Sequence, residues 1–158
     1  MLQFNPKGYL MPNGNITSDL RELKEIFTHN TASDKRNEIF EKYLVYSNSL
    51  KDSCSQPYLQ WVNGSFCTLK KEPADIDIVS FIPYLLIDAN EKQFKQFSHP
   101  NSEKEYGVDA YIVKIYPETS RLYPQFIGDR FYWLATFSKT KLNKAGKRYS
   151  KGFLEIIF

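Results

Sequence analysis

Two aspartates, Asp75 and Asp77, stand two residues apart in ADIDIVSF, a segment that is otherwise apolar and rich in β-branched residues. Side chains alternate along a strand, so the two carboxylates share one face while Ile76 and Ile78 share the other. Like charges about 4 Å apart repel by about 4 kcal/mol at an effective dielectric constant near 20. A shared proton, a basic side chain or a divalent cation would offset this repulsion, and oxygen ligands alone suit a hard ion such as Mg²⁺.

A Gly-Ser pair, Gly64-Ser65, ends the apolar run that precedes this segment. Glycine lets the backbone turn closely, and the Gly64 N–H and the Ser65 hydroxyl are candidates to hold a phosphate. The spacer FCTLKKEPA is short and contains Pro73, which predicts a turn or a single helical turn. We interpret Lys70 and Lys71 in this spacer as solvated.

A third acid, Asp109, opens the apolar segment VDAYIVKI. Two metal ions that bridge a triphosphate need one carboxylate beyond an Asp-x-Asp pair, and Asp109 is the candidate. The alternative is that Asp109 is a polar residue at a strand edge or caps an element. The combination of a Gly-Ser turn, an Asp-x-Asp strand and a later strand-borne Asp favours the metal site.

This combination resembles the signature of the nucleotidyltransferase superfamily that shares the DNA polymerase beta-like palm: Gly-Ser, a spacer, Asp-x-Asp, and a third acid on a later strand. Larger members carry a helix in the spacer, which the short FCTLKKEPA segment does not accommodate. The chain also resembles small bacterial and phage members, similar to minimal nucleotidyltransferase antitoxins. The matching stretches here are Asn5-Pro6-Lys7-Gly8, Gly64-Ser65-Phe66 and Lys151-Gly152-Phe153-Leu154.

The resemblance implies a function and a role for each matching residue. The chain would be a Mg²⁺-dependent nucleotidyltransferase that moves a nucleotidyl group from a nucleoside triphosphate, with ATP the expected donor, to a hydroxyl. Asp75 and Asp77 would bind two Mg²⁺ ions, and Asp109 would complete the metal site at the attacking hydroxyl. Gly64 and Ser65 would hold the outgoing pyrophosphate. The acceptor stays open: a partner protein such as a toxin, a nucleic-acid end or a small molecule.

The segment from Arg130 to Lys151 contains seven Lys or Arg residues and no Asp or Glu. Such a segment attracts phosphates, or it is a solvated turn between two strands. Arg148 is the preferred phosphate clamp because it lies in the turn-like stretch NKAGKRYSKG and guanidinium groups bind phosphates bidentately. Arg148 and Lys151 would reach a triphosphate only if this turn lies at the end of the sheet that carries the acids.

Hydrophobic periodicity predicts the elements that must position these residues. Together with the resemblance it indicates an α+β fold, a nucleotidyltransferase-like mixed β-sheet packed by helices and preceded by an N-terminal arm over residues 1–16. Asp19 is expected to cap a short helix through Phe27. The other predicted helices are Ser33 or Asp34 to about Lys51, and Tyr84–Phe97. The predicted strands are Tyr58–Val62, Ile76–Ile82, Val108–Ile115 and Phe153–Phe158, with Tyr132–Phe137 left open between strand and helix end.

The 158 residues correspond to a single domain, 1–158, which leaves no room for a second domain that recognises the base or the acceptor. No apolar run suggests a signal peptide or a membrane span, so we expect a cytoplasmic protein without membrane contact, with free thiols at Cys54 and Cys67. His29 and His99 receive no role. Two alternatives remain beside the enzyme: a catalytically weak palm-fold module that binds a partner protein, and a nucleic-acid binder that uses residues 130–151.

Overall fold

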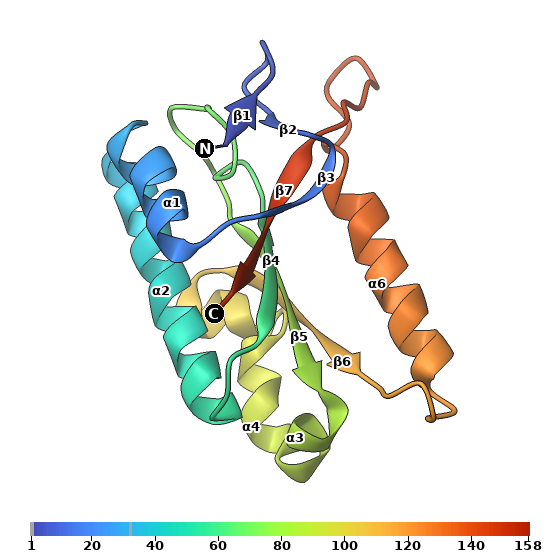
Figure 1. The fold of residues 1–158 in the computed structure, drawn as a ribbon. Coiled ribbons are helices and arrows are strands. Elements are labelled where there is room, and N and C mark those ends of the chain that lie inside the picture. The colour runs from blue at the N-terminus through green and yellow to red at the C-terminus, as the bar shows by residue number, and fades with distance from the viewer. Residues whose placement is uncertain (1, 32) are drawn as a thin grey trace.

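A five-stranded mixed β-sheet runs through the centre of the molecule (Figure 1). The structure is a computed structural model and describes residues 2–31 and 33–158. The strand order is β3-β7-β4-β5-β6; β3 with β7 and β5 with β6 are parallel, while β4 is antiparallel to both of its neighbours. The strands are β3 (Gly14–Thr17), β7 (Gly152–Ile157), β4 (Leu59–Asn63), β5 (Asp77–Pro83) and β6 (Asp109–Ile115).

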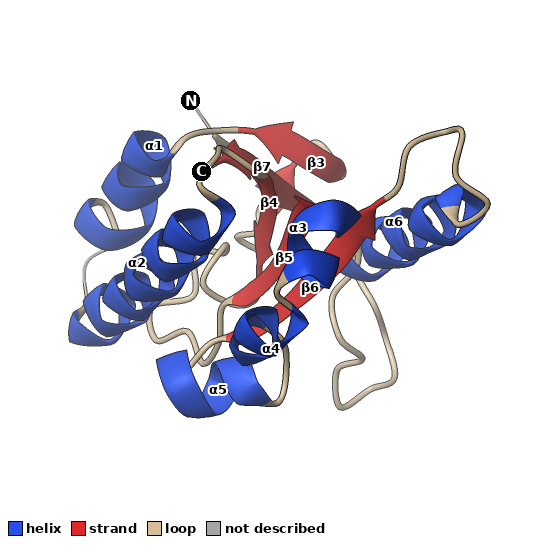
Figure 2. Ribbon diagram, turned by 90° about the horizontal axis from the view of Figure 1, so that it is seen from below, coloured by secondary structure: helices blue, strands red, loops and turns tan. Residues whose placement is uncertain are grey.

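Helices cover both faces of this sheet, and Figure 2 shows α1, α2, α4 and α5 on one side with α6 on the other. The mixed α+β class is therefore confirmed. The helices are α1 (Leu20–Lys24) with a following π turn (Glu25–His29), α2 (Asp34–Cys54), α3 (Tyr84–Ala89), α4 (Glu91–Phe94) with a 3-10 turn (Lys95–Phe97), α5 (Asn101–Tyr106) and α6 (Tyr123–Phe137). Among the described residues, no helix has both the length and the apolar character that a bilayer crossing requires.

Alternation along the strands divides the core between the two faces. Ile78, Ile82 and Leu154 pack with α2 and its neighbours, whereas Val79, Phe81 and Phe153 pack with α6. Strand β7 lies inside the sheet, as its continuous apolar run predicts. The acid-bearing face is the face that α6 covers, because Asp77 precedes Val79 by two residues on the same strand.

Most of the predicted elements are confirmed within a few residues. Asp19 accepts a hydrogen bond from the Glu22 N–H, and Ser33 does the same for the Arg36 N–H at the start of α2. The residues predicted as an N-terminal arm form a small hairpin, β1 (Gln3–Phe4) with β2 (Leu10–Met11), and then strand β3. The segment Tyr132–Phe137, for which the sequence leaves strand and helix end as alternatives, forms the C-terminal end of α6.

The prediction of one helix over Tyr84–Phe97 is wrong. Asn90 leaves the helical region, with φ −148° and ψ 50°, and separates α3 from α4. Within α3, Leu85 is 64% exposed and Ile87 is buried. The expected single helix is therefore interrupted at Asn90, although the apolar spacing still brings Phe94 and Phe97 into the core, where they are 4% and 1% exposed.

Candidate active site

The ends of three neighbouring strands bring the site together. Asn63 on β4 is the register partner of Asp77 on β5, and Asp77 is the partner of Asp109 on β6. Paired residues on adjacent strands point to the same face, so these three side chains form a row across the sheet on the α6 side. Asp75 lies two residues before this row, outside the strand.

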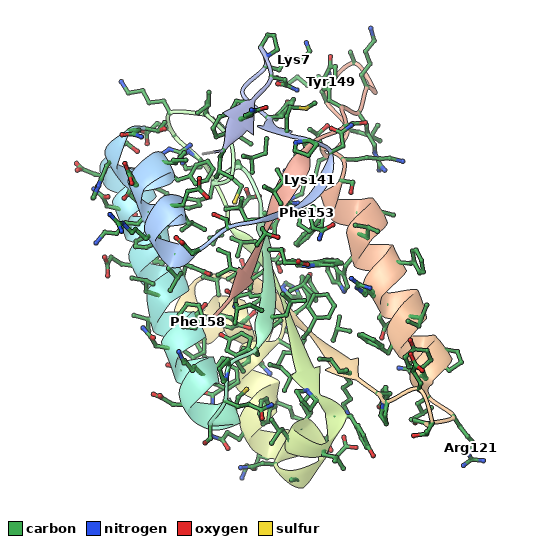
Figure 3. All side chains as sticks on the ribbon, in the orientation of Figure 1. Lys7, Arg121, Lys141, Tyr149, Phe153 and Phe158 are labelled. Carbon is green, nitrogen blue, oxygen red and sulfur yellow. The ribbon has the colours of Figure 1, made fainter. Side chains whose placement is uncertain are left out.

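A cleft of about 1200 Å³ opens over this row. Its walls come from the turn after β4, the C-terminal half of α6, the loop at Pro6–Tyr9 and the segment that leads into β7. The labelled residues Lys7, Lys141 and Tyr149 lie at this end of the molecule (Figure 3). All seven residues that the sequence singles out line the cleft: Gly64, Ser65, Asp75, Asp77, Asp109, Arg148 and Lys151.

Gly64 makes the turn after β4 possible by the absence of a side chain. Its φ is +87°, and a Cβ atom would lie 2.8 Å from the Asp75 carbonyl oxygen and 2.9 Å from the Asp77 nitrogen. Ser65 binds the same segment, since its N–H and its hydroxyl both donate to Oδ1 of Asp75 at 2.7 Å. In this structure the Gly-Ser turn therefore positions Asp75, and the phosphate contact expected of it stays a prediction.

A buried arginine holds the loop that follows Ser65. Arg36 of α2 is 0% exposed and donates to the carbonyl oxygens of Phe27, Phe66, Thr68 and Lys70. Burial lowers the pKa of Arg36, and the neighbouring Cys67 and Glu72 oppose this shift. The sequence offers little sign of this role, because an arginine on a helix is ordinarily read as solvent-exposed.

The two carboxylates of Asp75-x-Asp77 have opposite surroundings. Burial raises the pKa of Asp75, but the hydrogen bonds from Ser65 and the charge of Lys141 outweigh it and hold that pKa below its usual value. Burial and the negative charge of Asp75 raise the pKa of Asp77 to about 6. The surroundings thus stabilise the ionised form of Asp75, whereas the repulsion that the sequence predicts still disfavours the ionised form of Asp77.

Basic side chains surround the acids. Nζ of Lys141 lies 3.3 Å from Oδ2 of Asp75. Lys151 is buried and donates to the Gly64 carbonyl oxygen at 3.5 Å, and burial lowers its pKa. The turn before β7 therefore lies at the end of the sheet that carries the acids, the condition for Arg148 and Lys151 to reach a shared ligand. The basic residues that line the cleft are Lys7, Lys70, Lys139, Lys141, Arg148 and Lys151.

His99, which received no role from the sequence, lies beside the third acid. Its Nδ1 is 3.4 Å from Oδ1 of Asp109, and its ring stacks on Tyr111 with the centroids 5.8 Å apart. Burial and the charge of Asp109 raise the pKa of Tyr111 to about 12. His99 and Asp109 are ten residues apart, at no spacing typical of a shared site, so only the fold pairs them.

Aromatic side chains form the wall opposite the acids. Trp133 is partly buried, packs against Tyr111 at 4.5 Å between ring centroids, and lines the cleft. Tyr132 beside it is 62% exposed. Trp61 is 1% exposed and lies in the core, not in the cleft wall. Tyr111, Tyr132 and Trp133 give the cleft an apolar wall next to its charged floor.

The acids alone do not assemble a metal centre. Within residues 2–31 and 33–158, no three His, Cys, Asp or Glu side chains are placed to hold one ion together. Asp75 is engaged by Ser65 and Lys141, which leaves Asp77 and Asp109 as the acids of the strand row. Any ion at the row would need a further oxygen donor.

A protein-family comparison covers nearly the whole chain. The family model that matches residues 2–157 carries the description "Family of unknown function (DUF6932)". Searches of the curated proteins and of the solved structures found no match.

Proposed function

Given that the chain belongs to this family of unknown function, DUF6932, we propose that it is a nucleotidyltransferase with the palm of the DNA polymerase beta-like superfamily. The observation that carries the proposal is the convergence of all seven sequence-selected residues on one cleft. These residues come from the turn after β4, from β5, from β6 and from the segment before β7. The sequence motif alone does not require them to meet.

The proposed reaction transfers a nucleotidyl group from a nucleoside triphosphate, ATP in the first instance, to a hydroxyl. The acceptor oxygen forms a bond to the α-phosphorus, the bond between that phosphorus and the bridging oxygen of the β-phosphate breaks, and pyrophosphate leaves. Asp109 takes the proton of the attacking hydroxyl. Its Oδ1 is buried and has no hydrogen-bond partner among the described residues, so it is available as an acceptor.

The donor set fits Mg²⁺, because Asp75, Asp77 and Asp109 offer only oxygen atoms. We propose that these three carboxylates hold two Mg²⁺ ions once Asp75 releases Lys141, since in this structure the described acids are not placed around one ion. Bound Mg²⁺ would stabilise the negative charge that develops on the phosphates. Burial and the negative charge of Asp75 raise the pKa of Asp77 to about 6, so its ionised form is disfavoured in the metal-free protein.

The basic residues of the cleft would bind the triphosphate tail. Arg148 and Lys151 keep the role that the sequence predicts, and Gly64 with Ser65 forms the floor on which the pyrophosphate would lie. Lys141 joins this group because it already lies within 3.3 Å of Asp75 and is 83% exposed, so it can move to a phosphate at little cost. The proposed acceptor is a hydroxyl on a partner protein, such as a toxin, or on a nucleic-acid end.

A second candidate function is a binding module that uses the same cleft without catalysis. Two observations favour it: the acids alone do not assemble a metal centre among the described residues, and Phe131 and Tyr132 of α6 are 65% and 62% exposed, with Tyr132 lining the cleft. Such a module would bind a partner protein or a nucleic acid in a way that does not depend on Asp77.

Calorimetry with ATP separates the two functions. The nucleotidyltransferase should bind ATP in Mg²⁺ or Mn²⁺ and lose most of that affinity in excess EDTA. With ATP labelled at the α-phosphate, label should pass to protein or RNA of a cell extract; ATP labelled at the γ-phosphate should transfer none. Asp77→Asn should abolish transfer, whereas Asp52→Asn, an exposed acid on α2, should not. ATP affinity that is unchanged in EDTA would contradict the proposal.

A further inference from the structure

Asn63, at the end of β4, is a buried polar residue whose amide oxygen has no partner. The residue is 3% exposed, and its Nδ2 donates weakly to the Phe137 carbonyl oxygen at 3.4 Å. Its Oδ1 is buried and accepts no hydrogen bond from any described residue. Leaving a buried acceptor unpaired costs about 1–3 kcal/mol, so native proteins keep such a group only for a reason.

The unpaired oxygen of Asn63 belongs to a pattern across the sheet. Asp77 lies between Asn63 and Asp109 in the register of the strands, and Oδ1 of Asp109 is the other buried acceptor without a hydrogen bond among the described residues. The three neighbours offer oxygen atoms in a row, and ionised carboxylates cannot donate to an amide oxygen. The row therefore lacks a donor or a cation.

No protein cation among the described residues makes a hydrogen bond to an oxygen of this row, although the charges of Lys141 and Lys151 lower the pKa of Asp77. Lys141 contacts Asp75, and Lys151 contacts the Gly64 carbonyl oxygen. His99 is 3.4 Å from Oδ1 of Asp109 and makes no hydrogen bond to it. Two carboxylates and one amide oxygen on a rigid sheet form a ligand set that hard divalent cations prefer.

We propose that the Asn63 amide oxygen is a direct ligand of a divalent cation, Mg²⁺ or Mn²⁺, that it shares with Asp77 and Asp109. The inference rests on the proposed function and adds a residue that the Gly-Ser and Asp-x-Asp signature does not contain. It also explains why acidic side chains alone do not assemble a metal centre: the third donor is neutral. An amide supplies an oxygen without adding a third negative charge, which would raise the repulsion in the metal-free protein.

Two substitutions of opposite character test the inference with Mn²⁺ alone, without nucleotide. Asn63→Leu keeps the branched shape at Cγ but has no oxygen, and it should weaken Mn²⁺ binding, measured by electron paramagnetic resonance or calorimetry, by at least about tenfold. Asn63→Asp keeps an oxygen and adds a charge, so it should bind Mn²⁺ at least as tightly as the unmodified protein. Asp77→Asn should bind Mn²⁺ most weakly.

Thermal unfolding distinguishes a ligand from a structural residue. Without metal, Asn63→Asp should melt below the unmodified protein because three like charges then lie side by side, and Mn²⁺ should restore more of its stability than it adds to the unmodified protein. If Asn63 serves only the contact with Phe137, both variants lose stability, Mn²⁺ restores neither, and the inference is overturned. Mn²⁺ affinity of Asn63→Leu within twofold of the unmodified protein also overturns it.

Nucleotidyl transfer, measured separately, shows which claim has failed. Mn²⁺ binding that depends on Asn63 in a protein without transfer activity would overturn the proposed function and support the inference. Full transfer activity in Asn63→Leu would overturn the inference and leave the proposed function in place. An unmodified protein that binds no Mn²⁺ in the absence of nucleotide would overturn the inference alone.

Discussion

Strand β4 carries one buried amide on each face of the sheet, and the two amides differ in their partners. Gln60, on the α2 side, accepts from Tyr43 at 2.7 Å and donates to Ser80 at 3.1 Å, with Ser47 completing the network. The side chain of Asn63, on the α6 side, makes one weak hydrogen bond among the described residues, and its oxygen accepts none. A buried polar network in which every group is hydrogen-bonded stabilises the fold, whereas a buried polar atom without a hydrogen-bond partner is free to bind a ligand.

The same contrast separates the two cation systems. Arg36 is enclosed by the chain and meets four carbonyl oxygens, whereas Lys141 is 83% exposed and contacts a single carboxylate at 3.3 Å. Arg36 binds carbonyl oxygens within the loop between Ser65 and Asp75, and Lys141 contacts the Asp75 side chain at the end of that loop. The buried arginine shapes that loop, and the exposed lysine is free to exchange one negative partner for another.

Removing Arg36 should have the largest effect on stability. Arg36→Met leaves four carbonyl oxygens without their donor, and we expect a loss of at least about 3 kcal/mol in the free energy of unfolding, measured with urea. The neighbouring Lys35→Met removes only a surface ion pair with Glu38 and should cost less than about 1 kcal/mol. Equal effects of the two substitutions would contradict the distinction between a structural and an exposed cation.

Asp77 should make the metal-free protein less stable as the pH rises. Its pKa in the folded protein is about 6, against an ordinary value of 3.8, so between these values the folded state holds more protons than the unfolded state. The contribution of Asp77 to the free energy of unfolding is fully present below about pH 4, falls as the pH rises towards 6, and changes little above that. The total loss is about 3 kcal/mol.

Asp77→Asn should remove this decline. The free energy of unfolding of the variant, measured in EDTA between pH 4 and pH 8, should fall less steeply than that of the unmodified protein and exceed it at neutral pH. Stabilisation by Mn²⁺ should disappear at the same time. A variant that is much less stable than the unmodified protein at pH 8 would instead give Asp77 a structural role like that of Gln60.

Arg148 tests whether the basic segment belongs to the nucleotide site. Arg148→Ala should weaken ATP binding by about tenfold, because a lost hydrogen bond to a charged group costs roughly 1.5 kcal/mol or more. The adjacent Lys147 is exposed and does not line the cleft, so Lys147→Ala is the matched control and should change ATP affinity little. Unchanged ATP affinity together with lost binding of a partner would make this turn an interface.

Lys141→Met should have the smallest effect on stability, at most about 1 kcal/mol, since the lysine is mostly exposed. Its positive charge lowers the pKa of both Asp75 and Asp77, so its removal should move the stability decline of Asp77 to higher pH. The pH profile of unfolding in EDTA measures this shift. A profile that does not move would show that Lys141 leaves the acids uninfluenced in solution.

Local rules predict much of the fold correctly but fail where two elements combine. The Asp19 and Ser33 caps, the interior position of β7 and the shared face of Ile76 and Ile78 follow from neighbouring residues, and the structure confirms them. The break at Asn90 is missed because either short helix, taken alone, continues the apolar pattern of the other. Asn63 could have been found, since alternation places it on the face of Trp61 next to the Gly-Ser turn.

Neighbouring residues are enough to identify which side chains are able to do chemistry: carboxylates two residues apart, a glycine that permits a close turn, and cations gathered before the last strand. Each of these depends on residues that are close in the chain. Tertiary structure alone decided that Asp109 lies beside Asp77, that Asn63 completes the row, that His99 meets Asp109, and that Arg36 holds the loop. Those contacts depend on strand order and register, which arise when distant segments bury their apolar faces against each other.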